Sequence, residues 1–433
     1  MLDLTRPSVG SHVGCGVLAR MLRSLRALVL VENQDNMNPR RPFLLLAAAL
    51  VATVAVTMTA GQAAAAVHRV FPGESIQAAV DAASPGDTIL VEPGTYQEAP
   101  GNEYGLHITT DNLRLVGKVN HGQGEAGKVR LLHNGAQQTG VYAAPPGCGF
   151  RDSQCDGELQ GFYIRGFTVE GFPQNGIQTR WVNGFRFVRN ESVNNLNNGI
   201  YPTLSANGLV RNNVSYGSLD TSMWVAGSEN VRVVGNELYG SPIGFEITVS
   251  NNVRVSHNDI HDNTVGVGLF HPNAAGNPQI PVMADWVIQN NKIHHNNLPN
   301  PAPPGSFQAG LPPGGGVLLL GVSDHVVKKN TIENNDFVGI GVLGWCSATE
   351  LGDPSRNCLN SPPQADPSSN NNLIAMNDLK DNGLSPPPGF EPLAADIIYL
   401  QTPPFEPGVG NCFDRNVFDT FFSSAGELPT DGC

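Results

Sequence analysis

Charged residues are scarce in this chain of 433 residues, at 15% of the total. That proportion excludes a coiled coil or a highly charged disordered chain, because both depend on a high density of charge. Basic residues are scarcer than acidic ones, 25 against 38, and the formal net charge is −13. An acidic chain is a poor partner for nucleic acid and for an anionic membrane surface. Cysteine pairs with the close Cys-x-x-Cys spacing of a zinc site are also missing.

Helical patterns of about 10–15 residues do not separate the strand-like segments, which excludes alternating βαβ units. Instead, apolar residues alternate with polar ones in short runs that end at Asn or Gly, as in Val253-Arg-Val-Ser and Asn258-Asp-Ile-His. Period-two runs with Asn/Gly corners predict short strands joined by tight turns. Three such strands recur in each repeat, so the sequence predicts a parallel β-solenoid.

Asparagine marks the repeat at the start of Asn-x-apolar units. The predicted positions are Asn190, Asn212, Asn236, Asn258, Asn291, Asn330, Asn377 and Asn416. The first three intervals are 22, 24 and 22 residues. Later intervals are longer because of insertions rich in Pro, Gly or Asn, at 271–282, 299–313, 346–369 and 385–392.

These asparagines have a structural explanation. Asn tolerates the left-handed conformation of a sharp corner. Its amide can also bond to the same amide one coil away, at about 4.8 Å, which would form a ladder. A second predicted ladder consists of Asn195, Asn263, Asn296, Asn335 and Asn382.

A short amphipathic helix is predicted near residues 75–83. Ile76, Ala79, Val80 and Ala83 share one helical face, and Ser75 can cap the first turn. A solenoid needs a cover over its open end, and this helix is expected to supply one.

The segment from Glu74, Glu-Ser-Ile-Gln-Ala-Ala-Val-Asp-Ala-Ala-Ser-Pro-Gly-Asp-Thr-Ile-Leu-Val-Glu-Pro-Gly-Thr-Tyr, resembles the opening of pectin-lyase-like proteins. The Asn-x-Ile-x-x-Asn-x-x-x-Gly-Ile units are similar to the repeats of that family. The resemblance covers about residue 70 to the C-terminus. It implies an all-β fold, a right-handed parallel β-helix with 22–24 residues per coil and the N-terminal capping helix. It implies no single activity, because the fold carries lyases, hydrolases, epimerases, copper-maturation accessory proteins and non-catalytic surface proteins.

Export is predicted from the N-terminal region. Residues 37–66 have a basic start, a nearly all-apolar run and an Ala-x-Ala end, which is typical of a secretory signal peptide. Residues 1–36 are then an extension from a start codon placed too early, and residues 67–433 form a single β-helix domain. An uncleaved membrane anchor is the alternative. We expect a secreted monomer.

Six cysteines follow the predicted signal peptide, and an even number in an exported chain indicates disulfides. The simplest pairing joins nearest neighbours along the chain. The pairs are then Cys148–Cys155, Cys346–Cys358 and Cys412–Cys433.

One outward strand face of the solenoid is expected to hold the functional site. In the first half of the chain, alternate residues on this face are Gln178 and Arg180, Tyr201 and Thr203, Trp224 and Ala226, Glu246 and Thr248. In the second half they are Leu318 and Leu320, Gly341 and Leu343. The first half is therefore polar and aromatic, and the second half is apolar.

Polysaccharide binding or processing is the predicted function. Tyr201 and Trp224 are candidate carbohydrate-binding residues, because sugar rings stack on aromatic faces. Glu246, Asp220 and Arg180 are candidate catalytic residues. A glycoside hydrolase needs two carboxylates, and a lyase needs a base with a cation or acid for the uronate. The family's Asp-Asp and Gly-His-Gly signatures are missing, which leaves a non-catalytic cell-surface or adhesion protein open.

Two histidines share one repeat position. His261 and His294 are candidate metal ligands on consecutive coils, with Glu333 next in the same column. They leave open a periplasmic protein similar to the copper-accessory branch of the family. No cofactor is demanded by the sequence, although its acidic charge is compatible with a divalent cation. Arg232 and Arg254 share another column, which indicates either solvated arginines or a uronate-binding stripe.

Overall fold

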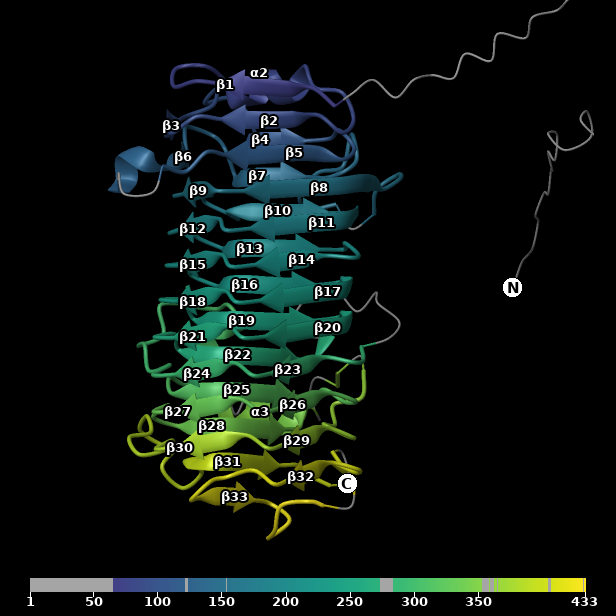
Figure 1. Ribbon diagram of the computed structural model, residues 1–433. Helices are drawn as coiled ribbons and strands as arrows, with labels where there is room; N and C mark the ends of the chain where they lie inside the picture. Colours follow the sequence, from purple (N-terminus) through teal and green to yellow (C-terminus); the bar gives the residue numbers. More distant parts are fainter. Residues whose placement is uncertain are drawn as a thin grey trace, which may run out of the picture. The chain divides into compact units, whose positions relative to one another are not determined.

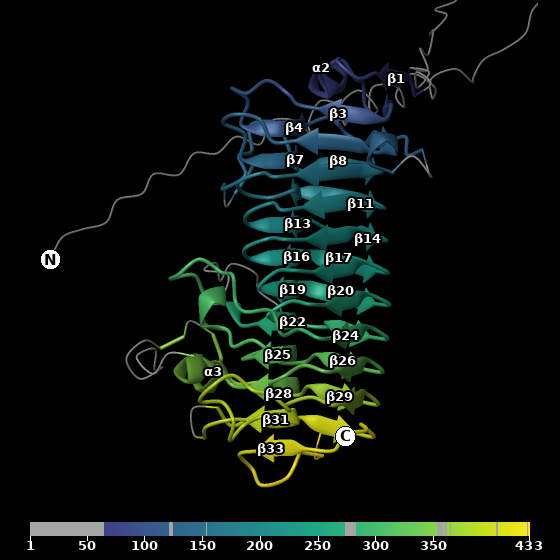
Figure 2. The same cartoon turned by 90° about the vertical axis from the view of Figure 1, so that its left-hand side faces the viewer.

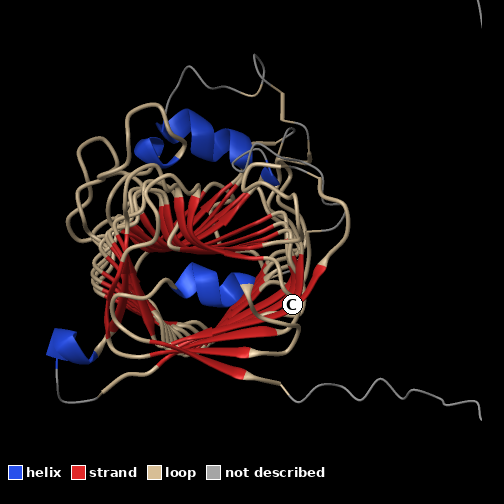
Figure 3. Cartoon of the chain, turned by 90° about the horizontal axis from the view of Figure 1, so that it is seen from above, coloured by secondary structure: helices blue, strands red, loops and turns tan. Residues whose placement is uncertain are grey.

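The computed structural model describes residues 65–433 except 121–123, 153, 273–282, 353–357, 359–361, 364, 404–405 and 431. The predicted extension at 1–36 and nearly all of the predicted signal peptide at 37–66 lie outside the described residues, so both stay predictions. The described strands form three parallel sheets, named here A, B and C. Figure 3 shows the sheets as three sides of one coil.

Sheet A has twelve described strands, each paired in parallel with the strand one coil away. They are β1 (Val67–Val70), β2 (Thr88–Val91), β5 (Leu113–Gly117), β8 (Leu159–Arg165), β11 (Val182–Val188), β14 (Leu209–Arg211), β17 (Glu229–Val234), β20 (Asn251–Ser256), β23 (Val287–Gln289), β26 (Val326–Lys328), β29 (Leu373–Ala375) and β32 (Cys412–Asp414). Figure 1 shows them stacked in chain order along the axis.

Sheet B has ten described strands, most of them three residues long. They are β3 (Gly94–Tyr96), β6 (Val129–Leu132), β9 (Phe167–Glu170), β12 (Glu191–Val193), β15 (Val214–Tyr216), β18 (Glu237–Tyr239), β21 (Asp259–His261), β24 (Lys292–His294), β27 (Thr331–Glu333) and β30 (Asp378–Lys380).

Sheet C has eleven described strands and carries the candidate site. They are β4 (Tyr104–Ile108), β7 (Thr139–Ala143), β10 (Ile177–Arg180), β13 (Asn198–Thr203), β16 (Thr221–Ala226), β19 (Ile243–Thr248), β22 (Val265–Phe270), β25 (Gly315–Leu320), β28 (Val338–Leu343), β31 (Ala395–Leu400) and β33 (Phe421–Ser423). The predicted all-β parallel β-helix is therefore confirmed.

The described helices are few and short: α2 (Ile76–Asp81), α3 (Trp345–Gly352) and the 3₁₀ turns η1 (Gly124–Gly127) and η3 (Gln308–Gly310). The predicted capping helix is α2, at the N-terminal end of the coil (Figure 1). The Ser75 hydroxyl caps it by accepting a hydrogen bond from the backbone N–H of Ala78. Ile76 and Val80 are buried against the first coils, so this helix closes the apolar interior from water.

The first asparagine ladder forms with one correction. Asn213, not the predicted Asn212, occupies the ladder position: its Oδ1 accepts from the backbone N–H of Asn190, and its own backbone N–H donates to Asn236. The ladder then runs without a break through Asn258, Asn291, Asn330, Asn377 and Asn416.

The predicted left-handed corner is displaced by one residue from the ladder. Positive φ angles occur at the residue before each ladder asparagine, for example 57° at His257 before Asn258. The ladder asparagine itself immediately precedes the next strand, as Asn258 precedes β21. Its amide is selected for hydrogen bonding, since a buried amide without partners would cost about 1–3 kcal/mol per group.

The second ladder is also present. In its later part, the backbone N–H of each asparagine donates to the side-chain oxygen of the next one. The bonds run from Asn263 to Asn296, from Asn296 to Asn335 and from Asn335 to Asn382. Ser218 and Ser241 replace asparagine in two coils: the Ser241 hydroxyl accepts from the backbone N–H of Ser218, and the backbone N–H of Ser241 donates to the side-chain oxygen of Asn263. The ladder ends when Asn382 donates to Asp396.

The three predicted disulfides are confirmed: Cys148–Cys155, Cys346–Cys358 and Cys412–Cys433. The first and second brace loops beside sheet C, and the third ties the C-terminus to β32. Three bridges fit an extracellular protein. In the part of the chain that the structure describes, no helix has the length and apolar character needed to cross a membrane.

Candidate functional site

The outward face of sheet C has the predicted residue pattern. The register pairs Gln178 with Tyr201 and Trp224 with Glu246, so these side chains lie in one column along the axis. The same column continues through Gly268 and then Leu318. The change from a polar to an apolar face therefore falls between β19 and β25.

Tyr201 and Trp224 stack on each other, with ring centroids 4.7 Å apart and planes 13° from parallel. Both side chains are partly exposed. Each ring gives one face to the other, so the surface they offer a ligand consists mainly of ring edges. The Trp224 indole N–H is occupied by the hydroxyl of Thr248, at 3.0 Å. A flat sugar platform is thus not what this pair forms, and their carbohydrate-binding role stays a prediction.

Asp220 and Glu246 converge on one hydroxyl beside the aromatic pair. Thr221 Oγ1 lies 2.8 Å from Glu246 Oε2 and 3.3 Å from Asp220 Oδ1. The two carboxyl oxygens are therefore at most about 6 Å apart, a limit that admits the spacing of about 5–5.5 Å in a retaining glycosidase pair. One hydroxyl proton can be donated to only one of them, so the arrangement favours a proton on the other carboxyl.

Burial is the main influence on the acidity of this pair. It raises the pKa of Asp220 to about 7, and the hydrogen bond from Thr221 opposes the rise. Burial also raises the pKa of Glu246 well above its usual range, and the nearby Asp220 charge raises it further. Glu246 is only 1% exposed, whereas Asp220 is partly exposed. At neutral pH the pair therefore holds a proton on Glu246 and a second, exchangeable proton on Asp220.

Arg180 forms its hydrogen bonds with a loop and not with these acids. Its Nε donates to the backbone carbonyl of Asp152, and its Nη1 donates to the carbonyl of Phe150, at 2.5 and 3.0 Å. Both carbonyls belong to the loop that the Cys148–Cys155 bridge braces. Arg180 is 9% exposed, and this loop holds it in place. Its predicted catalytic role is untested, and its contacts are those of a loop anchor.

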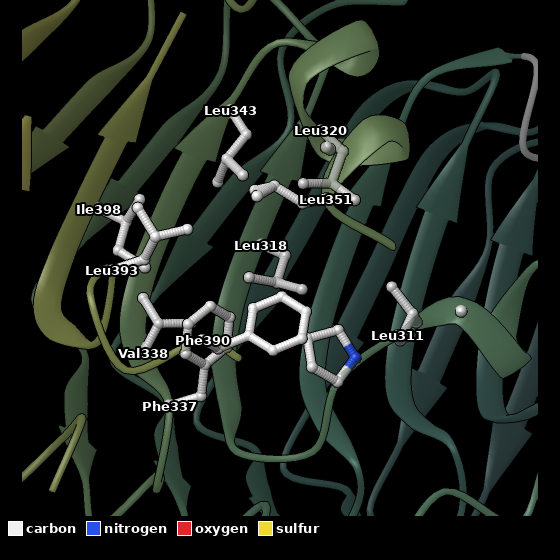
Figure 4. A pocket seen from close by; sticks show the side chains of 13 residues that line it. Leu311, Leu318, Leu320, Phe337, Val338, Leu343, Leu351, Phe390, Leu393 and Ile398 are labelled. Atoms are coloured by element: carbon white, nitrogen blue, oxygen red, sulfur yellow. The ribbon is translucent and has the colours of Figure 1, made fainter. Parts of the chain in front are cut away.

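The apolar half of sheet C is covered by insertions. α3 and the loops that contribute Leu311, Phe390 and Leu393 lie over the strands, on one side of the coil (Figure 2). Figure 4 shows the side chains from these insertions lining one pocket together with Leu318 and Ile398 of sheet C. One cavity left there has a volume of about 50 Å³, too small for a sugar ring, and a second of about 270 Å³ lies between Phe307, Leu320 and Trp345.

His261 and His294 stack on the outward face of sheet B with ring centroids 5.2 Å apart. Their ring nitrogens point to separate partners. His261 Nδ1 lies 2.8 Å from Asp262, and His294 Nε2 lies 2.9 Å from Asp259. The lone pairs of stacked rings run side by side and do not point toward one metal position. The predicted metal site therefore stays a prediction.

Among the described residues, one group of three potential ligands converges within 4.8 Å: Cys148, Asp152 and Cys155. The two sulfurs form a disulfide and have no thiolate to offer a metal. The suggested divalent cation therefore has no prepared set of ligands in this part of the chain.

The sequence analysis did not identify two contributors to this face. Thr221, which joins the two carboxyl groups, could have been found from its position beside Asp220. At the N-terminal end, a pocket of about 500 Å³ is lined by Asp81, Glu103, Tyr104 and His107. It forms where α2 meets β4, a contact between segments that no local pattern predicts.

Residues 147–280 and 175–354 match the family model of the right-handed β-helix region. The chain is a right-handed parallel β-helix protein. No curated relative matches it in sequence.

Solved structures share the β-helix fold at low identity. The A-module of the mannuronan C-5 epimerase AlgE4 from Azotobacter vinelandii has a TM-score of 0.50 and 16% identity, over 79% of this chain and 90% of its own. ORF18 of Geobacillus virus E2 has a TM-score of 0.50 and 12% identity, over 79% of this chain and 58% of its own. An alginate lyase from Paenibacillus sp. str. FPU-7 has a TM-score of 0.40 and 13% identity, over 81% and 95%. At these identities the likeness shows the fold alone.

Proposed function

We propose that this β-helix protein is a secreted glycoside hydrolase that cleaves a polysaccharide at Asp220 and Glu246. One observation carries the proposal: the carboxyl groups of Asp220 and Glu246 both contact the hydroxyl of Thr221. Their contacting oxygens are at most about 6 Å apart, and both groups have raised pKa values. Hydrolysis of a glycosidic bond needs one protonated and one ionised carboxyl. This pair supplies both forms near neutral pH, because the two pKa values differ.

The two acids take different roles. Asp220 is the carboxyl that a bound glycan reaches, and its ionised form acts on the anomeric carbon or on a water molecule. Glu246, buried behind it, holds the proton that the leaving glycosidic oxygen requires. The hydroxyl of Thr221 contacts both carboxyl groups and so links their protonation states, while a local movement that exposes Glu246 brings its proton to the leaving oxygen. Tyr201 and Trp224 border the same site and would orient the sugar through their ring edges.

A hydrolase fits better than a lyase. Elimination from a uronate requires a group that neutralises the sugar carboxylate. Arg180, the predicted cation, is bound to two backbone carbonyls. No cation is among the causes of the pKa shifts of Asp220 and Glu246. A neutral polysaccharide is therefore the substrate class that the site supports.

A non-catalytic glycan-binding protein is the second candidate. The 1% exposure of Glu246 favours it, because a substrate cannot touch that carboxyl without local movement. The epimerase and the alginate lyase named above act on polysaccharides, which agrees with a glycan ligand for either candidate.

The test is to incubate the purified protein with neutral glucans, xylans and mannans, and with pectins and alginates. Reducing ends report hydrolysis, and ultraviolet absorbance of unsaturated products reports elimination. We expect reducing ends from a neutral glycan, and a loss of at least about 100-fold in Asp220→Asn and Glu246→Gln. Unsaturated products from an acidic glycan would show a lyase. Retention of a glycan without any product would show the non-catalytic candidate.

A further inference from the structure

A staggered row of arginines, spread over two adjacent columns, runs along the outward face of sheet A. One arginine lies on each of six consecutive strands, β5, β8, β11, β14, β17 and β20. We call them the arginine stripe: Arg114, Arg165, Arg186, Arg211, Arg232 and Arg254. All six side chains are exposed. They are six of the 19 Lys and Arg residues that follow residue 66, in a chain with a net charge of −13.

The strand register fixes the spacing of the stripe. Arg232 lies directly opposite Arg254 on the neighbouring strand, and Leu209 links Arg186 to Arg232 in the same column. Arg165 and Arg211 lie two residues further along their strands, in the next outward column, on either side of Val188. The positive charges therefore recur once per coil, at a rise of about 4.8 Å, and alternate between the two columns from Arg114 to Arg232.

The stripe lacks counterions within the protein. None of its six guanidinium groups forms an ion pair with a carboxylate of the described residues, whereas Arg69, Lys118, Lys128 and Arg130 all do. One acidic residue, Glu229, lies on these six strands. Like charges directly opposite each other in a sheet are destabilising. The directly opposed pair Arg232 and Arg254 thus imposes a cost that a bound polyanion would remove.

We propose that the arginine stripe binds a linear acidic polysaccharide that carries one carboxylate per sugar, as a site separate from the hydrolase site. The guanidinium group binds a carboxylate through two parallel N–H···O bonds, which a lysine cannot do. The rise of one coil is close to the length of one sugar unit in an extended chain. Carboxylates that project alternately to the two sides of the glycan can therefore meet successive arginines in the two columns.

Nucleic acid is a poorer fit to this surface. Single-stranded nucleic acid is held by aromatic rings on which its bases stack. The stripe has one ring nearby, Tyr163, and the guanidinium of Arg114 already covers it at 4.4 Å from the ring centre. The strongly negative charge of the remaining protein would also repel a long nucleic acid.

Sheets A and C are different sides of the coil, as Figure 3 shows. A glycan on the stripe would therefore leave the Asp220–Glu246 site free. The stripe would hold the protein on a carboxylated extracellular matrix while the other face acts on a neutral chain. This role does not depend on the proposed hydrolase activity.

The experiment is affinity electrophoresis of the purified full chain in gels that contain sodium polygalacturonate, sodium alginate or neutral dextran. The stripe variant carries four substitutions: Arg186→Gln, Arg211→Gln, Arg232→Gln and Arg254→Gln. The control variant removes the same charge from exposed cations elsewhere: Lys292→Gln, Lys329→Gln, Lys380→Gln and Arg415→Gln. Circular dichroism confirms that both variants are folded.

We expect the acidic glycans, but not dextran, to retard the wild type, with a retardation that weakens in salt. The stripe variant should bind at least 10-fold more weakly, and the control variant within twofold of the wild type. The stripe proposal is overturned by equal binding of the stripe variant, by no binding of the wild type, or by tighter binding to single-stranded DNA. Hydrolysis is measured in parallel to separate the two sites. Asp220→Asn should lose hydrolysis of the neutral glycan but bind acidic glycans as the wild type does.

Discussion

Replacing Asp220 with Asn should stabilise this protein at alkaline pH, although it removes a residue of the proposed site. The native pKa of Asp220 is raised to about 7 by burial. An unfolded aspartate titrates near 3.9. Between these values the folded protein binds the proton that the unfolded chain has lost, so stability falls as pH rises from about 4 to 7.

The magnitude follows from the shift. Three units of pKa correspond to about 4 kcal/mol as an upper limit, at 1.36 kcal/mol per unit. Asp220 is partly exposed, so screening by solvent reduces the expected gain of Asp220→Asn at pH 8 to about 2–3 kcal/mol. At pH 4 the carboxyl is protonated in the folded wild type, so the two proteins should agree within about 1 kcal/mol.

Urea unfolding followed by circular dichroism at pH 4, 5, 6, 7 and 8 measures this difference. The control is Asp378→Asn, because Asp378 is an exposed acid on sheet B. Its difference from the wild type should stay flat over the same range. If Asp220→Asn is less stable than the wild type at pH 8, or if the difference does not change with pH, then burial does not control this carboxyl.

The remaining predictions concern the ladder, a buried histidine and the aromatic pair. Asn258→Ala removes a buried amide that bonds to Asn236 and Asn291, and should lower the unfolding free energy by about 3–5 kcal/mol in urea titrations. Asn230 is an exposed asparagine whose side chain bonds to those of Asn207 and Asn252, and an equal cost for Asn230→Ala would contradict this. Burial lowers the pKa of His325 to about 3, so stability should fall as pH drops below about 6.5, because the unfolded imidazole gains a proton that the folded one cannot hold. If the unfolding free energy of the wild type falls no more steeply below pH 6.5 than that of His325→Asn, the prediction is refuted. Trp224→Ala should weaken retention on the neutral substrate by at least about 10-fold, and unchanged retention would remove the aromatic pair from the site.

The repeat could be predicted from the sequence because each coil reuses the same local chemistry. Period-two alternation placed Tyr201, Trp224 and Glu246 in one outward column, and the register confirms that placement. The ladder was misplaced at Asn212 because two asparagines are adjacent there. The left-handed residue and the buried ladder residue cannot be distinguished by residue type alone.

The candidate site was less predictable, because its properties depend on contacts between distant segments. Arg180 was expected beside the acids, yet the disulfide-braced loop binds its guanidinium. Tyr201 and Trp224 were expected to present open faces, and they instead stack on each other. The coupling of Asp220 to Glu246 depends on two neighbouring coils and on the hydroxyl of Thr221, which no spacing rule selects.

The central claim is that Glu246 keeps its proton at neutral pH while the neighbouring Asp220 titrates near pH 7, on the outer face of the β-helix. Carbon-13 NMR of protein labelled at the Asp and Glu carboxyl carbons tests it, with Asp220→Asn and Glu246→Gln used for assignment. The account predicts that the Asp220 signal titrates near pH 7 while the Glu246 signal is still protonated. Complete ionisation of both carboxyl groups below pH 5 would contradict it.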